Sequence, residues 1–194
     1  MGNYTVIADV GQGIVNLLRQ HITTEGILRK EQIGLCSLRE SGDYRLGICL
    51  YDIQECSQLP YEGRRMRGED QQINASMYLD LYYIILPFMN SDWRYRSAEE
   101  QRLLGKTLQV LRDFPLLDPV TYETENCVDS HTIQLELLCL GLEEQTRIWN
   151  SLNENRRNAV YCRAAAVELE STRIRRVKRV EEIQIRMKGG AHEA

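Results

Sequence analysis

Apolar and polar residues alternate most regularly along Met77–Met89, MYLDLYYIILPFM. Such a period of two is typical of a half-buried β-strand. From Ile84 onward both sets of alternating positions are apolar, which indicates that this end of the strand is covered on two sides. The stretch therefore predicts the central strand of a sheet, with the neighbouring segments packed on it. Its continuous apolar face consists of Leu79, Leu81, Tyr83 and Ile85.

A different spacing marks the start of the chain, where apolar residues recur every three or four positions along Val6–His21. This spacing predicts an amphipathic helix, and Asn3 or Thr5 is the expected cap. Gly11 and Gly13 each cost about 1 kcal/mol relative to alanine inside a helix. We therefore expect another element to pack closely against these two glycines.

Further segments along the chain have the periodicity of regular secondary structure. Ser97 and Glu100 have the spacing of a capping box, so a second helix is predicted to begin at Ser97. Pro115 is expected to end that helix near Asp113. A third helix is predicted over Leu142–Leu152. The other predicted strands are Ile33–Leu38, Tyr44–Glu55, His131–Leu140 and Ala159–Leu169.

Two long stretches, Ser57–Ala75 and Leu116–Ser130, match neither period. Loops of this length in a compact domain are usually functional or disordered. The first is basic, because it contains Arg64, Arg65 and Arg67. It is interpreted either as a solvated, mobile loop or as a loop that becomes ordered against a partner.

Charge is distributed unevenly along the 194 residues. The formal net charge is −4, but residues 173–188 contain seven basic and two acidic residues, a balance of +5 that leaves −9 on the remainder. Apolar residues interleave with these arginines without a clear helix or strand period. We therefore predict one domain over residues 1–171, followed by an extended basic arm and tail over 172–194 that contacts a partner or another copy of the chain.

Candidate catalytic and metal-binding motifs are weak. Asp129, Ser130 and His131 are consecutive, and consecutive residues of an extended chain point in alternating directions, so they do not form a catalytic relay by themselves. Cys127 and His131 have no second ligand pair at metal-binding spacing. The six cysteines form no C-x-x-C pair and are interpreted as reduced structural thiols. We expect no enzymatic activity, no cofactor and no metal.

Membrane and nucleic-acid partners are not expected either. No apolar run approaches the roughly 20 residues of a membrane span, and no secretory signal is visible. The arginines of the arm could attract phosphates, but the chain is acidic overall and the arm lacks aromatic residues for base stacking.

Several segments carry a resemblance to a known family. They are NYTVIADVGQGIVNLLRQ, RLGICLYDIQE, LDLYYIILPFM, EQRLLGKTLQVLRDFPLL and IQLELLCLGLEEQTRIWNSLNENRRNAVYCRAAAVELES. In this order they resemble the cap, or tail-terminator, proteins of extracellular contractile injection systems, such as the antifeeding prophage particles. Gly141 stands where a capping serine or threonine is expected, and the two irregular stretches lie outside the resemblance.

The resemblance implies a structural protein. It implies a single α/β tail-terminator-like domain, with a mixed β-sheet flanked by about three helices and an extended C-terminal arm. Six copies would form a ring on the distal end of the inner tube, engage the last sheath layer, stop polymerisation and couple tube to sheath. The ring would assemble in the bacterial cytoplasm as part of a particle that can be released from the cell. A different sheath or baseplate component, a nucleic-acid-binding accessory protein and an enzyme of unknown type remain as alternatives.

The arm is the expected partner-binding segment. Apolar residues interleaved with basic ones suit the addition of a β-strand to a sheath subunit or to a neighbouring cap. The basic residues of 64–67 are a second candidate, as a loop that contacts the tube or the ring. The predicted arm residues are Arg173, Ile174, Arg175, Arg176, Val177, Lys178, Arg179, Val180, Ile183 and Ile185.

Overall fold

The computed structural model describes residues 4–22, 28–40, 42–56, 63–67, 71–89, 92–118 and 132–176. The chain divides into two compact units. The first unit comprises Met1–Pro60 and Ser76–Glu170, and the second comprises Tyr61–Ala75 and Ser171–Ala194.

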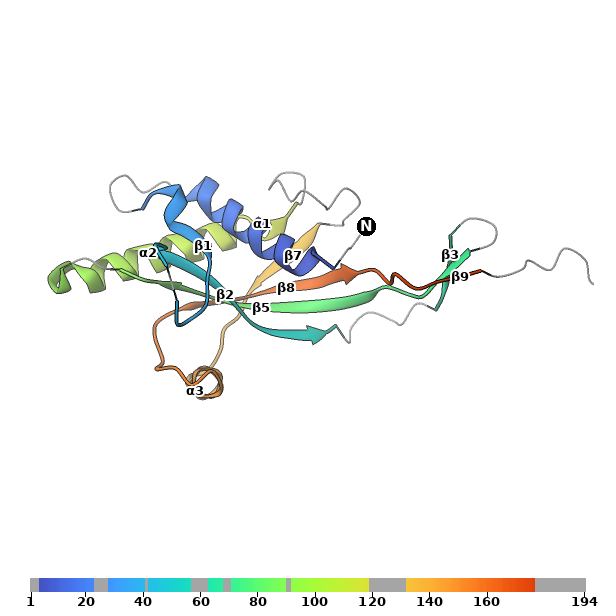
Figure 1. The fold of residues 1–194 in the computed structure, drawn as a ribbon. Helices are drawn as coiled ribbons and strands as arrows, with labels where there is room; N and C mark the ends of the chain where they lie inside the picture. Colours follow the sequence, from blue (N-terminus) through green and yellow to red (C-terminus); the bar gives the residue numbers. More distant parts are fainter. Residues whose placement is uncertain are drawn as a thin grey trace, which may run out of the picture. The chain divides into compact units, whose positions relative to one another are not determined.

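A six-stranded mixed sheet forms the centre of the first unit, and β5 lies inside it as predicted (Figure 1). β1 and β2 are parallel, and the other neighbouring strands are antiparallel. In spatial order the strands are β1 (Ile33–Leu35), β2 (Leu46–Glu55), β5 (Met77–Pro87), β8 (Val160–Leu169), β7 (Ile133–Leu137) and β6 (Leu116–Leu117).

Helices cover both faces of this sheet (Figure 1). One face carries α1 (Val6–His21) and α2 (Trp93–Asp113), and the other carries α3 (Leu142–Ser151). A short 3-10 helix, η1 (Lys30–Gln32), precedes β1. The alternation along β5 explains the two layers, because alternate side chains of a strand point to opposite faces. Leu81 and Ile85 join the core with α1 and α2, whereas Ile84 and Leu86 join a smaller cluster with Trp149 of α3.

The glycines of α1 pack as closely as predicted. A Cβ at Gly13 would lie 2.9 Å from Leu117 Cδ2, and one at Gly11 would lie 3.1 Å from Leu35 Cδ2. Both leucines belong to edge strands, β6 and β1. The two glycines therefore allow α1 to approach both edges of the sheet.

The predicted start of the second helix at Ser97 was wrong. The helix begins at Trp93, and the Asp92 carboxylate caps it by accepting a hydrogen bond from Arg94 N at 3.3 Å. Ser97 lies inside the helix, where its hydroxyl accepts from Gln101 Nε2 at 3.3 Å. An aspartate in extended backbone is a strong cap, and Asp92 stands in the position that lets the helix gain another turn.

A polar network accompanies an irregularity between β5 and β8. The pairing register shifts between Leu79 and Leu81, and Ala166 opposite has a φ of 54°. Asp80 Oδ1 accepts from Ala166 N at 3.0 Å, and Asp80 Oδ2 lies 3.3 Å from Arg163 Nη1. Arg163 Nη2 in turn donates to Glu136 Oε2 at 2.6 Å. The network supplies partners for charges that lie largely out of solvent.

The second unit contains a small antiparallel sheet in the order β3-β4-β9. Its strands are β3 (Arg65–Arg67), β4 (Gln71–Ile73) and β9 (Ile174–Arg176). The stretch Ser57–Ala75, expected to be irregular, therefore contains two short strands. Three-residue strands have too few residues to display a period of two. The boundary between 1–171 and 172–194 stays a prediction.

Candidate functional site

The small sheet joins the two segments that the sequence marked as partner-binding. Ile73 of β4 pairs with Arg65 on one side and with Ile174 on the other, and Gln71 likewise pairs with Arg67 and Arg176. More than a hundred residues separate β3 from β9 along the chain. The structure therefore brings both basic segments into one hydrogen-bonded sheet.

This sheet is strongly basic over the residues that the structure describes. Six arginines and no acidic residue occur in 63–67, 71–75 and 171–176. Met66 is 56% exposed and Ile174 is 51% exposed, so each offers apolar contact area. The Ser171 hydroxyl accepts a hydrogen bond from Arg173 N at 3.2 Å, just before β9 begins. The arginines are Arg64, Arg65, Arg67, Arg173, Arg175 and Arg176.

Backbone groups at the sheet edges add to its binding potential. β3 and β9 are the outer strands, and within the described part of the chain neither has a partner on its outer side. Unpaired N–H and C=O groups of an edge strand can form a ladder with an added strand. An acidic, extended segment would satisfy both the open backbone and the arginines.

The sequence singled out some residues of this sheet as candidates, and their partner-binding role stays a prediction. Arg64, Arg65, Arg67 and Arg173–Arg176 lie together in it. β4 was missed, because Gln71–Ile73 is short and polar and has no strand signal. The predicted arm residues outside the described part of the chain are Val177, Lys178, Arg179, Val180, Ile183 and Ile185.

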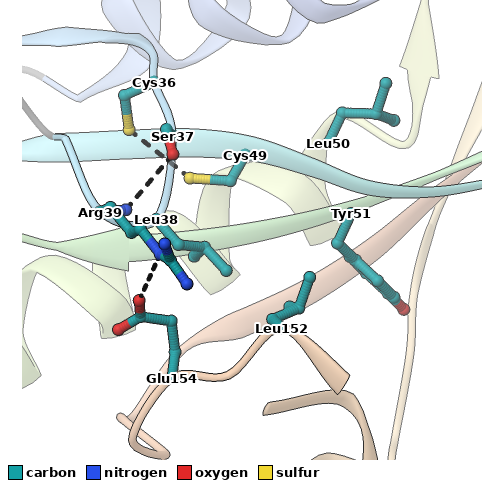
Figure 2. A pocket seen from close by; sticks show the side chains of 9 residues that line it. All are labelled: Cys36, Ser37, Leu38, Arg39, Cys49, Leu50, Tyr51, Leu152 and Glu154. Carbon is teal, nitrogen blue, oxygen red and sulfur yellow. Dashed lines mark hydrogen bonds and ion pairs between the residues drawn. The ribbon is translucent and has the colours of Figure 1, made fainter. Parts of the chain in front are cut away.

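A second notable feature is a thiol-lined pocket of about 320 Å³ in the first unit (Figure 2). Cys36 follows β1 directly, and its thiol points toward that of Cys49 on β2, with 3.5 Å between the sulfur atoms. The Arg39 guanidinium, on the pocket rim, pairs with Glu154 at 3.0 Å. The remaining lining residues are Ser37, Leu38, Leu50, Tyr51 and Leu152.

The two thiols are not equivalent. A hydrogen bond from Cys49 lowers the pKa of Cys36, because a thiol donor stabilises the neighbouring thiolate. The same hydrogen bond, together with burial, raises the pKa of Cys49. Cys36 is therefore the thiol that ionises first. No local sequence pattern indicates this pair, because the two cysteines come together only through the parallel pairing of β1 and β2.

Among the described residues, no group of three histidine, cysteine or acidic side chains is arranged to hold a metal ion. Within the same ranges, none of the helices combines the length and the apolar character that crossing a bilayer requires.

Comparison with known proteins assigns the family. A family model described as the Pvc16 N-terminal domain matches residues 9–182. The chain belongs to the Pvc16 N-terminal domain family. The matched range begins inside α1 and extends past β9, so this Pvc16 N-terminal domain includes residues of both units.

Two solved structures share the fold of this Pvc16 N-terminal domain. One is the sheath/tube terminator, in the extended state, of the extracellular contractile injection system PVC. It has a TM-score of 0.64 and 17% identity, and the match covers 96% of this chain and 65% of that one. The other is the anti-feeding prophage cap, a tube-terminating cap, with a TM-score of 0.64 and 15% identity over 93% of this chain and 61% of that one. A search of curated proteins finds no match at the significance threshold.

These findings confirm the resemblance and the fold class predicted from the sequence. The mixed sheet flanked by three helices is the fold that the two terminator structures share with the chain. The chain spans 65% and 61% of the lengths of those two proteins.

Proposed function

We propose that this chain is a structural cap, or tail terminator, of a contractile injection system. The observation that carries the proposal is the fold shared over 96% of the chain with a sheath/tube terminator, together with membership of the Pvc16 N-terminal domain family. In this role six copies form a ring on the distal end of the inner tube and sheath. Its partners are other copies of the chain, terminal tube subunits and terminal sheath subunits.

A cap has to stop growth as well as bind. A head-to-tail interface closes into a ring when its rotation closes, and a closed ring uses up the surface through which copies would otherwise keep adding. One face of the ring then matches the tube, and the opposite face offers no docking site for a further layer. The role is structural, and we propose no catalytic step. Assembly takes place in the cytoplasm, before the particle is released.

The basic three-stranded sheet is the proposed contact with sheath or with a neighbouring cap. Ile174–Arg176 already pairs with β4 inside the chain, so a partner strand adds at the outer edge of β9. Backbone hydrogen bonds would supply affinity in this arrangement. The arginines would steer an acidic partner and set its register.

Imaging assembled particles tests the cap role. Particles made with and without this chain are compared for tube length, sheath length and density at the distal end. Loss of the distal density, with overlong tubes or shed sheath, supports the proposal. Unchanged distal ends in particles that lack the chain would refute it.

Charge reversal tests the proposed contact separately. Arg173→Glu, Arg175→Glu and Arg176→Glu combined should leave the first unit folded and weaken sheath retention. A matched control reverses three exposed arginines of the first unit, Arg102, Arg112 and Arg147. Equal sheath retention by the two triple variants would contradict the contact while leaving the cap role intact.

The basic sheet also favours one alternative, a nucleic-acid-binding accessory protein. Six arginines on a small sheet could contact phosphates, and such binding weakens steeply as salt increases. The net charge of −4 opposes it. Salt-dependent retention of the chain on immobilised DNA, lost in the Arg173, Arg175 and Arg176 variant, would support this alternative over the cap.

A further inference from the structure

The thiol pair beside β1 lies at the edge of the six-stranded sheet. In the parallel register Leu35 is opposite Ile48, so the next residues, Cys36 and Cys49, are neighbours across the two strands. Cys36 N donates to Ile48 O at 3.1 Å, so the pairing extends one residue past β1. The backbone therefore holds the two cysteines side by side.

The geometry is close to that of a disulfide. Neighbouring strands lie about 4.8 Å apart, inside the Cα separation of about 4.4–6.8 Å that disulfides span. The sulfur atoms are 3.5 Å apart, and a bond requires about 2.05 Å. Closing the remaining 1.5 Å or so requires side-chain rotation, and the strands can remain paired.

Gly47 leaves space for the thiol of Cys36. A Cβ at position 47 would run into Cys36 Sγ and the ring of Phe88, so the glycine there leaves the Cys36 thiol its space. Both cysteines line the pocket, where Cys36 is half-buried and Cys49 is buried. Of the two thiols, Cys36 is therefore the more accessible to a small molecule.

We propose that Cys36 and Cys49 form a redox-active dithiol site, which small-molecule disulfides oxidise to an intrachain disulfide, with Cys36 as the attacking thiol and Cys49 as the resolving thiol. The inference rests on the geometry of the first unit and holds whether or not the chain is a cap.

The reaction is a pair of thiol–disulfide exchanges. The Cys36 thiolate attacks one sulfur of the small disulfide and forms a mixed disulfide, and the other half leaves as a thiolate. Cys49 then loses its proton to the released thiolate or to solvent and attacks Cys36 Sγ. The Cys36–Cys49 bond forms, and the second half leaves. The two protein thiols are oxidised, and the small disulfide is reduced to two thiols.

The expected state follows the compartment. A reducing cytosol keeps such a pair as thiols, whereas an oxidising exterior allows the bond to form. The bond would fasten β1 to β2 at a place where the two strands share only the pairs Ile33–Leu46, Gly34–Gly47 and Leu35–Ile48. Oxidation would therefore strengthen an edge of the sheet that few backbone pairs hold.

Glutathione disulfide is the probe for a direct test. The reduced full-length chain is incubated with it, the remaining thiols are alkylated, and the digested peptides are analysed by mass spectrometry. The expected product is a Cys36–Cys49 cross-link that forms before the exposed Cys139 acquires glutathione. Cys49→Ser should retain glutathione on Cys36 as a stable mixed disulfide, and Cys36→Ser should leave Cys49 unmodified. The control Cys139→Ser should form the cross-link at the wild-type rate.

The wild-type chain alone shows whether the Cys36–Cys49 disulfide forms, so a variant that fails to fold does not obscure that result. The proposal would be overturned if Cys139 carries glutathione while Cys36 and Cys49 are both recovered as alkylated, unreacted thiols. A cross-link from Cys36 to any other cysteine would also overturn it. In a folded Cys49→Ser chain, glutathione absent from Cys36 would disprove the assigned order of attack.

Discussion

A buried hydrogen bond joins α3 to β8. Deleting it tests how much this bond stabilises the packing of α3 on the sheet. Trp149 is 2% exposed and Tyr161 is 4% exposed. Trp149 Nε1 donates to Tyr161 Oη at 2.8 Å. Tyr161→Phe removes the acceptor and keeps the ring, so the indole N–H stays in the core without that partner.

The expected cost of Tyr161→Phe follows from the unpaired indole N–H. A buried donor left without an acceptor lowers the free energy of unfolding by about 1–3 kcal/mol. For a chain of this size, each 1 kcal/mol shifts the melting temperature by about 2–4 °C, so Tyr161→Phe should lower it by roughly 2–12 °C. Tyr95→Phe is the matched control, because it deletes the same atom from a side chain that is 65% exposed. The control should change the free energy of unfolding by less than about 0.5 kcal/mol.

Urea unfolding followed by far-UV circular dichroism measures both variants. A double-mutant cycle with Trp149→Phe isolates the hydrogen bond, because Tyr161→Phe should cost less once the indole donor is gone. Equal stabilities for Tyr161→Phe and Tyr95→Phe would refute the reasoning. So would a cost for Tyr161→Phe that is the same with and without the indole.

Three other predictions concern backbone strain, packing and pH. Ala166→Gly relieves a φ of 54° and should stabilise the chain by up to about 1 kcal/mol in urea unfolding; a loss of stability would contradict it. Gly34→Ala places a Cβ in the ring of Tyr44 and should cost about 1–3 kcal/mol in a thermal melt, whereas Gly63→Ala, which meets nothing within 4 Å, should be nearly neutral. Burial raises the pKa of Cys162 to about 12 from 9.0, so the folded state holds this proton more tightly and stability is lost as pH rises through that window. Urea midpoints at about pH 8 and about pH 10.5 should differ by an amount that Cys162→Ala reduces, and an unchanged difference would refute the assignment.

The elements with long, regular periodicity were predictable from sequence. The predicted helix Val6–His21 has the observed bounds of α1, and Met77–Met89 contains β5 in its central place. Burial of one face accounts for the regular spacing in both elements. A shift of the element by one residue would turn its apolar side chains away from the core. The predicted start of α2 was wrong, because the sequence offers both a capping box at Ser97 and an aspartate cap at Asp92. Local sequence alone does not rank the two.

The candidate site could be predicted only in part, for a physical reason. Basic charge is a local property, so Arg64–Arg67 and Arg173–Arg176 were both identified. Their pairing through β4 is non-local. Strands of three residues are also too short to show a periodic pattern of side chains. The proximity of Cys36 and Cys49 is non-local in the same way, since it depends on a parallel register that neither β1 nor β2 displays by itself.

The pairing of β9 with β4 changes how the arm has to be tested. For an arm that projects freely, deleting everything after Ser171 is the direct experiment. In the structure that deletion also removes β9 and exposes an edge of β4, so lost sheath retention would reflect either a missing contact or a disrupted small sheet. Reversing the charges of β9 keeps its backbone hydrogen bonds and changes only what the sheet offers a partner. Sheath that is kept on charge reversal would exclude the arginines from the contact even if truncation sheds it, because truncation also disrupts the small sheet.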